Sequence, residues 1–207
     1  MKKYLILFLT LILSGCSVVR INTNNLDTII DVVLSKNNSL YNRDGRGYKY
    51  YIPNGVTHID TDDLTHTLYY NGEYLYLYVD IVSYYYNKDI KFKKNDYAYY
   101  SRKLNLDNKK KKGYVEVIKK DDLYYVNFYY NYARIEALVT EEDLNNTILN
   151  ATYILSTIKY NKGLIKTMLD DEYLINKAGK YDLFKTNDKT EKFILQKDKE
   201  GEWLWSF

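Results

Sequence analysis

The sequence has a single cysteine, Cys16, among its 207 residues. One cysteine cannot form a disulfide within the chain, so the folded domain must be stable without one. The sequence also has a single proline, and neither an internal repeat nor a low-complexity linker divides it. Its length is typical of one domain that buries a proper core.

A strong excess of charge is also absent. The formal net charge is +3, and the side-chain total falls to +1 without Lys2 and Lys3. Proteins that bind nucleic acid usually carry a strongly basic footprint, so we expect no nucleic-acid partner. The one dense basic run, Lys109 to Lys112, is predicted to be a solvated loop between two strands; attraction to an anionic membrane surface is the alternative.

The motifs of common enzymes are missing too. No serine stands in a Gly-x-Ser-x-Gly elbow, and there is no phosphate-binding loop or dinucleotide fingerprint. Carboxylates far apart in sequence can meet in a hydrolase site. The acidic runs 121–122, 141–142 and 170–172 nevertheless stand in turns or at helix ends, where solvation or capping explains them. We therefore predict no catalytic residue and no cofactor.

The first fifteen residues have the order of a secretory signal. Lys2 and Lys3 precede a short apolar run, Tyr4 to Leu13, and the small residues Ser14 and Gly15 follow. The apolar run is shorter than the roughly 20 residues that a membrane-spanning helix needs. The basic residues remain on the cytoplasmic side, which directs the rest of the chain outward. Residues 1–15 are therefore predicted to be a signal peptide that is removed.

The four residues Leu13-Ser14-Gly15-Cys16 resemble the lipobox of bacterial lipoproteins. The resemblance covers only the first sixteen residues. It implies that the thiol of Cys16 receives a diacylglyceryl group and that cleavage makes Cys16 the first mature residue. Two acyl chains give a stable anchor without spanning the membrane. We expect a protein on the outer face of the cell membrane, tethered through residues 16–24; the alternative is an ordinary signal peptide with a chance cysteine.

Tyrosine is the most over-represented residue, with 26 copies. Lysine and asparagine are abundant as well, and all three are residues that an AT-rich genome encodes readily. This composition indicates a low-GC bacterium. It also means that the abundance of tyrosine is not by itself evidence of function.

Two helices are expected, near 25–36 and 140–160. In the first, apolar residues recur at helical spacing, and Asn24 or Asn25 is a suitable N-cap. Thr140 opens the second, followed by acidic residues that suit the positive end of the helix dipole. Residues 161–163 should end it. A shorter helix is predicted from Leu164 to Asn176, within a C-terminal tail from about 164 whose aromatic end, 203–207, is expected to dock on the domain.

Between these helices the pattern is that of strands separated by turns. Strands are expected at 48–52, 56–60, 65–70, 73–86, 97–101, 114–118 and 123–139, the last with a bulge or break near Tyr132-Ala133 where the apolar parity changes. Asn71-Gly72 is a strong hairpin signal. The prediction is a single α+β domain, 25–207, with an antiparallel β-sheet of about six to eight strands packed against the two helices. The order is similar to that of PsbP-like α-β-α sandwiches, which implies an extracytoplasmic accessory protein.

The segment 73–86 is the clearest strand, and a run of this length is also expected to bend or split in two. Its odd-numbered aliphatic residues from Leu75 to Ile81 share one side of the sheet. Five tyrosines are expected on the other side and are the best candidates for a binding surface, since tyrosine is enriched at such surfaces: Tyr74, Tyr76, Tyr78, Tyr84 and Tyr86. The alternative is that helices or the C-terminal tail cover these rings.

Both histidines lie in one polar cluster: His58, Asp60, Asp62, Asp63 and His66. On a hairpin, His58 and His66 could face each other, and imidazole and carboxylate are good zinc ligands. We take His58, Asp60, Asp62 and His66 as a candidate metal site. The alternative is a charged surface hairpin, because no recognised zinc or calcium spacing is matched.

The sequence therefore favours a non-enzymatic lipoprotein that binds or assembles an envelope component, such as a protein, peptide or glycan, through a tyrosine-rich sheet. The alternative is an envelope hydrolase or metal-dependent enzyme that uses the cluster from His58 to His66. A substrate-binding subunit of a transporter is disfavoured because such proteins are usually larger and two-lobed.

Overall fold

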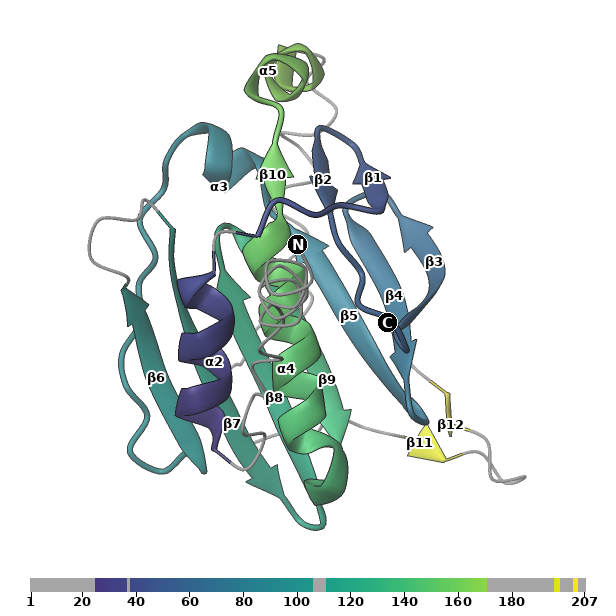
Figure 1. The fold of residues 1–207 in the computed structure, drawn as a ribbon, viewed down its shortest axis with the longest axis vertical. Coiled ribbons are helices and arrows are strands. Elements are labelled where there is room, and N and C mark those ends of the chain that lie inside the picture. Colours follow the sequence, from purple (N-terminus) through teal and green to yellow (C-terminus); the bar gives the residue numbers. More distant parts are fainter. Residues whose placement is uncertain (1–24, 37, 106–110, 171–195, 198–202, 205–207) are drawn as a thin grey trace, which may run out of the picture.

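The computed structural model describes residues 25–36, 38–105 and 111–170, and two short strands near the C-terminus. Its centre is a seven-stranded, fully antiparallel sheet with the order β3-β4-β5-β9-β8-β7-β6 (Figure 1). The strands are β3 (Thr57–Asp62), β4 (Thr65–Tyr70), β5 (Glu73–Val79), β6 (Tyr100–Asn105), β7 (Lys112–Lys120), β8 (Leu123–Tyr130) and β9 (Ala133–Val139). The α+β fold and the predicted number of strands are confirmed.

Two long helices lie on one face of this sheet. They are α2 (Leu26–Ser35) and α4 (Glu141–Thr157), close to the predicted ranges. The Asn25 side chain accepts a hydrogen bond from Thr28 N, and the Thr140 hydroxyl accepts one from Asp143 N, so both predicted N-caps are confirmed. The third helix, α5 (Lys162–Asp170), begins before the predicted Leu164, because Asn161 starts this helix instead of ending the previous one.

A second, small sheet joins the helix layer. It contains β1 (Arg43–Gly45), β2 (Tyr48–Tyr50) and β10 (Lys159–Tyr160), in the order β1-β2-β10. The backbone N–H of Tyr51 donates to the Thr157 hydroxyl at 3.0 Å, which fixes this sheet beside the end of α4. The aliphatic face of the large sheet is therefore covered by α2, α4 and the small sheet.

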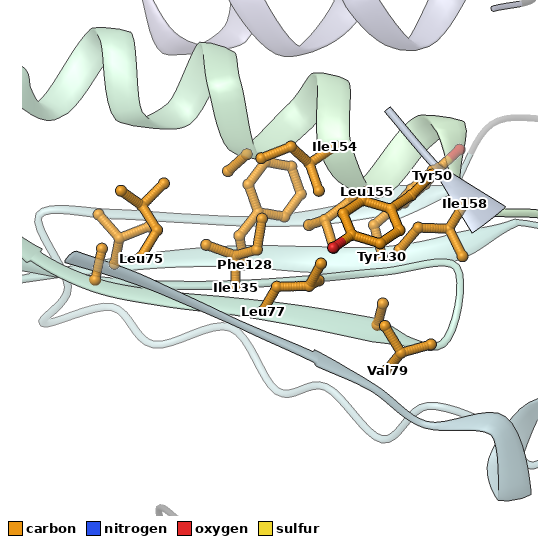
Figure 2. Close-up of a cluster of buried hydrophobic side chains, with 14 of the residues drawn as sticks. Tyr50, Leu75, Leu77, Val79, Phe128, Tyr130, Ile135, Ile154, Leu155 and Ile158 are labelled. Carbon is orange, nitrogen blue, oxygen red and sulfur yellow. The ribbon is translucent and has the colours of Figure 1, made fainter. Parts of the chain in front are cut away.

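The core lies between α4 and the aliphatic face (Figure 2). Leu75, Leu77 and Val79 of β5 are fully buried there, as the period of two predicts. Phe128 and Ile135 contribute from the neighbouring strands, opposite apolar residues of α4 that include Ile154 and Leu155.

The change of apolar parity between β8 and β9 comes from a tight hairpin, where the sequence predicted a bulge or break. Asn131 and Tyr132 form the two-residue turn, with φ of 54° and 58°. Both central residues of a type I′ turn have positive φ, and Asn tolerates this conformation well. A two-residue turn places Tyr130 opposite Ala133, so the odd-even parity switches across it.

The run from Glu73 to Tyr86 does split, as its length allowed, but its second part is not a strand as predicted. β5 ends at Val79, and a short helix, α3 (Ile81–Tyr85), follows. The side chain of Asp80 accepts a hydrogen bond from Ser83 N at 2.8 Å and caps this helix. Alternation of apolar and polar residues continued past Asp80 in the sequence, but the capping carboxylate ends the strand.

Two further predictions, the strand at 97–101 and the solvated loop at 109–112, differ in part from the structure. The strand predicted at 97–101 begins at Tyr100 and runs to Asn105. In the basic run, Lys112 opens β7 and the Lys111 ammonium donates to the Ser156 carbonyl, so these two residues are not in a solvated loop. Residues 109 and 110 lie outside the described residues, as do the predicted signal peptide 1–15 and tether 16–24.

Most of the C-terminal tail also lies outside the described residues. Only β11 (Gln196–Lys197) and β12 (Trp203–Leu204) are described there, as an antiparallel pair. The predicted docking of the aromatic end on the domain therefore stays a prediction.

Candidate functional site

The side of the large sheet opposite α2 and α4 carries seven tyrosines from four strands, and we call it the tyrosine face. Residues directly paired across neighbouring strands point to the same side. The register therefore places these side chains together: Tyr69, Tyr74, Tyr76, Tyr78, Tyr114, Tyr125 and Tyr129. No helix of the described residues lies on this face, so covering by a helix, one of the predicted alternatives, is wrong for this part of the chain.

Five of these tyrosines form two groups of contacting rings. On β4 and β5, Tyr74 contacts Tyr69 edge-on, at 5.3 Å between ring centroids, and stacks on Tyr76 at 6.4 Å. On the other side, Tyr114 of β7 stacks on Tyr129 of β8 at 5.7 Å, and Phe92 stacks on Tyr114 at 4.7 Å. The groups lie on β4–β5 and on β7–β8, so β9 runs between them. Tyr74 remains 42% exposed and Tyr69 36% exposed, so the first group presents ring surface to solvent.

A row of polar side chains separates the two groups. Glu136 of β9 is only 4% exposed, accepts a hydrogen bond from the Tyr125 hydroxyl at 2.9 Å, and forms an ion pair with Arg134 at 3.5 Å. Burial raises the pKa of Glu136, while Arg134 and the Tyr125 hydrogen bond lower it. The Arg134 guanidinium also lies 6.0 Å from the ring of Tyr78. The centre of the tyrosine face is therefore a charged, partly desolvated row.

Asn127 adds an unsatisfied polar atom to this row. It is paired with Glu136 across β8 and β9, so its side chain lies on the tyrosine face. Its Oδ1 atom is buried and accepts no hydrogen bond from the described residues; the same holds for the hydroxyl of Thr65, on the same face of β4. A buried acceptor without a partner is costly.

Tyr84 and Tyr86 are not part of the tyrosine face, which corrects the predicted set of five. They follow Asp80 on α3 and at its C-terminal end, so the period of two no longer applies to them. Tyr84 stacks on Tyr160 of β10 at 3.9 Å, in a separate cluster, while Tyr86 is 56% exposed. Tyr74, Tyr76 and Tyr78 do share one face, as predicted.

The two histidines meet on the β3–β4 hairpin, which we call the histidine hairpin. Their ring centroids are 5.7 Å apart. Thr61 lies between them: its hydroxyl is 2.8 Å from His58 Nε2 and 2.9 Å from His66 Nδ1. The other nitrogen of His66 is 2.5 Å from the hydroxyl of the buried Tyr48. Burial, with His58 as a smaller cause, lowers the pKa of His66 to about 4, so its ring is neutral at pH 7.

The aspartates do not join the histidines. A register shift between His58 and Asp60 breaks the alternation of β3, so that Asp60 and Asp62 pair with Thr67 and Thr65, whose side chains lie on the tyrosine face. The described residues contain no group of three or more His, Cys, Asp or Glu placed to hold a metal ion. The geometry links His58 and His66 through a threonine hydroxyl and does not complete the candidate set with Asp60 and Asp62.

The sequence interpretation missed the polar row and the second aromatic group. Arg134 and Glu136 stand between the two groups, beside Asn127 of β8, because β9 inserts between β5 and β8 in the sheet order. The alternation of β8 does contain a usable signal, since Tyr125, Asn127 and Tyr129 have the opposite parity to the buried Val126 and Phe128.

Comparisons with known proteins add no relative. No family model matches the chain, and no curated protein or solved structure is significantly similar to it. In the described part of the chain, no helix combines the length and the apolar character needed to cross a membrane.

Proposed function

We propose that this protein is a lipoprotein, held on the outer face of a bacterial membrane through Cys16, which binds a glycan of the cell envelope on its tyrosine face without enzymatic turnover. The observation that carries the binding role is the polar row of Arg134, Glu136 and Asn127 between two groups of aromatic rings. Rings offer flat apolar surfaces to the faces of a sugar, and the polar row supplies donors and acceptors for hydroxyl groups.

The carboxylate of Glu136, an acceptor at the centre of the polar row, supports a ligand that carries hydrogen-bond donors. Sugar hydroxyl and N-acetyl groups carry such donors on the edges of a flat ring. An extended peptide would meet the same face, but it gains most of its affinity from the hydrogen bonds of a sheet edge, and this face presents side chains. We therefore favour a glycan, with a peptide as the other outcome of the test.

The binding test uses the N-acetylglucosamine tetrasaccharide as probe, titrated into the full chain by calorimetry. Tyr74→Ala removes an exposed ring of the first group and should weaken binding about tenfold, the loss of one good stacking contact. Tyr97→Ala is the matched control, because Tyr97 is 99% exposed and lies outside both groups. Binding that is unchanged in Tyr74→Ala contradicts the proposal. If the face binds a peptidoglycan stem peptide and not the tetrasaccharide, its ligand is a peptide.

The proposed location on the membrane depends on the lipobox-like residues Leu13-Ser14-Gly15-Cys16. Cys16→Ser removes the thiol that would be acylated, so the precursor should accumulate uncleaved and the lipid-linked form should disappear from the membrane fraction. Processing and membrane attachment that persist unchanged in Cys16→Ser would show that the lipobox assignment is wrong.

An enzyme built on the histidine hairpin is the second candidate from the sequence, and the hydrogen-bonded series His58–Thr61–His66–Tyr48 gives it no metal-binding carboxylate. Metal analysis of the purified chain decides between the two. If the purified chain contains one zinc per molecule and His58→Ala loses it, the metal-dependent enzyme is favoured over the non-enzymatic binding protein.

A further inference from the structure

The molecule has one strongly basic edge, although the chain as a whole is nearly neutral. Six exposed lysines lie on β6, on β7 and on the segment that leads into β6, and we call them the lysine edge: Lys88, Lys91, Lys93, Lys94, Lys103 and Lys112. Three aspartates, Asp89, Asp96 and Asp107, lie among them in the sequence. Because the side chains of the predicted mature protein total +1, the remainder of the protein carries a net negative charge.

Packing against the sheet holds these lysines outward. Ile90 and Phe92 are half-buried, and Phe92 stacks on Tyr114 of β7, whereas Lys91 and Lys93 are exposed. The backbone N–H of Asn95 donates to the Ser101 hydroxyl at 3.2 Å and joins the segment to β6. The segment runs from α3 to β6 along this side of the sheet (Figure 1).

Most of the lysine edge is not neutralised internally. Lys112 forms an ion pair with Asp89 at 3.6 Å, and Lys94 with Asp96 at 3.9 Å. Within the described residues, no ion pair involves Lys88, Lys91, Lys93 or Lys103. These four ammonium groups are available to an anionic partner.

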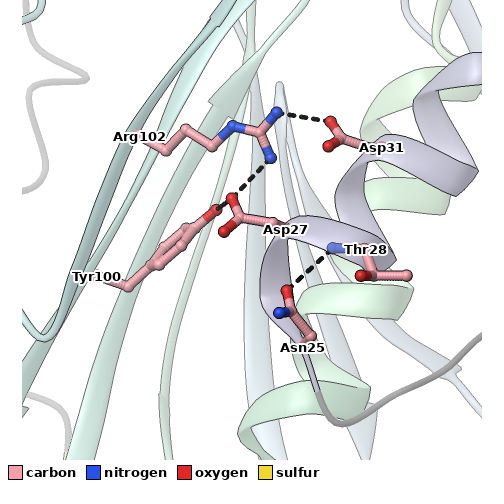
Figure 3. Close-up of polar contacts among 6 residues, drawn as sticks. All are labelled: Asn25, Asp27, Thr28, Asp31, Tyr100 and Arg102. Carbon is pink, nitrogen blue, oxygen red and sulfur yellow. Dashed lines mark hydrogen bonds and ion pairs between the residues drawn. The ribbon is translucent and has the colours of Figure 1, made fainter.

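The start of α2 is fixed to the same edge. Arg102 of β6 donates to the carboxylate of Asp27 at 2.8 Å and to that of Asp31 at 2.6 Å, and the Tyr100 hydroxyl also donates to Asp27 at 2.6 Å (Figure 3). Asn25, the N-cap of α2, is therefore next to β6. The eight residues from Ser17 to Asn24 span at most about 30 Å, since an extended residue advances by roughly 3.3–3.6 Å. A lipid on Cys16 would hold the β6 edge close to the membrane surface.

We infer that the lysine edge is a second membrane contact, which binds the anionic lipid headgroups of the leaflet that holds the acyl chains. This inference rests on the lipid anchor of the proposed function. Each lysine near an anionic leaflet strengthens adhesion about fivefold. The contact orients the domain with β6 towards the membrane, and it leaves Tyr69 and Tyr74, on the other half of the sheet, away from the lipid.

Lysine acetylation followed by mass spectrometry tests this contact on the full lipidated chain. The chain is reconstituted in vesicles of phosphatidylcholine, with or without phosphatidylglycerol. On the anionic vesicles the acetylation of Lys88, Lys93 and Lys103 should slow at least about fivefold, and about 1 M salt should reverse the effect because it shortens the Debye length to ~3 Å. Equal rates on both vesicles overturn the inference. Lys49 and Lys159 are internal controls, because they are paired in the small sheet, which lies away from β6 (Figure 1).

Charge reversal provides the matched comparison. Lys91→Glu with Lys93→Glu should abolish the protection of Lys88 and Lys103 on anionic vesicles, whereas Lys49→Glu with Lys159→Glu should leave it unchanged. Equal effects of the two double variants would show a general attraction of a charged protein, and would overturn the assignment to the lysine edge.

Failure of the anchor and failure of the lysine edge give different results. A chain that is not acylated will not float with phosphatidylcholine vesicles, but anionic vesicles added to it should still protect the lysine edge. Absence of that protection overturns the inference. Soluble polyphosphate is the third arm: if polyphosphate protects these lysines and anionic vesicles do not, the partner is an anionic polymer and the membrane assignment is wrong.

Discussion

The hydroxyl of Tyr48 and Nε2 of His66 lie 2.5 Å apart in the core between β2 and β4. With the proton on Nδ1, the His66 ring accepts from Tyr48 and donates to the hydroxyl of Thr61. Thr61 can then donate to His58 at the surface. Both polar atoms of a buried imidazole are satisfied in its neutral form, so this interaction joins the small sheet to the large one without burying a charge.

Protonation of His66 should destabilise the protein in mild acid. Burial lowers its pKa from the ordinary 6.5 to about 4, so between these values the unfolded chain binds a proton that the folded chain does not. The free energy of unfolding should therefore rise with pH through this window, by about 3 kcal/mol in total. Urea denaturation at a series of pH values measures it. Subtracting the curve of His66→Gln isolates the contribution of His66, and a difference that does not change with pH would contradict the pKa.

Asn131 should contribute more to the free energy of unfolding than an ordinary turn residue does. Its φ is 54°, and its side-chain amide donates to the buried carbonyl of Ile158 at 2.9 Å. Asn131→Ala should lower the free energy of unfolding by about 2–3 kcal/mol, from the left-handed backbone and the lost buried hydrogen bond. Asn87→Ala is the control, because Asn87 has a φ of 49° but is exposed, and about 1 kcal/mol is expected. Equal losses would show that the hydrogen bond contributes nothing.

Arg102 should hold α2 on β6 with only moderate strength. The guanidinium binds both Asp27 and Asp31, but these carboxylates are more than half exposed. Such surface pairs contribute little, so Arg102→Met should cost about 1 kcal/mol, measured by urea denaturation. Arg46→Met removes the single ion pair to Asp63 and should cost less. Because the two Arg102 pairs are partly screened, the difference between the variants should shrink at high salt.

Two glycines should respond to alanine in opposite directions. A Cβ on Gly113 would lie 2.1 Å from the Tyr129 carbonyl oxygen, so β7 and β8 would have to separate. Gly113→Ala should cost at least about 2 kcal/mol and disturb the contact of Tyr114 with Tyr129. Gly163 lies in α5, where a Cβ meets only an ordinary contact at 3.6 Å. Gly163→Ala should stabilise by about 0.5–1 kcal/mol, as thermal or urea denaturation would show.

Local signals in the sequence were sufficient for the elements themselves. The caps Asn25 and Thr140 act on backbone N–H groups three residues away, so their roles follow from the chain alone. The burial of Leu75 and Leu77, with Tyr74 and Tyr76 on the opposite side, follows from the period of a strand in the same way. The strand was extended wrongly past Asp80 because two local signals overlap there. The alternation of apolar and polar residues continues through Asp80, but its side chain caps a helix.

The candidate site depends on strand order, which no local pattern contains. Arg134 lies beside Tyr78 because β9 pairs with β5, although 55 residues separate the two in the chain. The bulge at His58 decides that Asp60 faces away from the histidines, and the burial of His66 under Tyr48 decides its charge.

The sequence by itself determined the α+β class, the helix starts and the side of β5 on which its tyrosines lie, because caps and periodicity act within a few residues. The signal and lipobox pattern at Cys16 is equally local, and it predicts where in the cell the protein is located. Only the tertiary structure decided which polar residues stand among the tyrosines, that His58 and His66 meet through Thr61, and that the lysines gather at the edge where α2 begins. Those relationships depend on long-range pairing, whose geometry is set by the packing of the whole sheet.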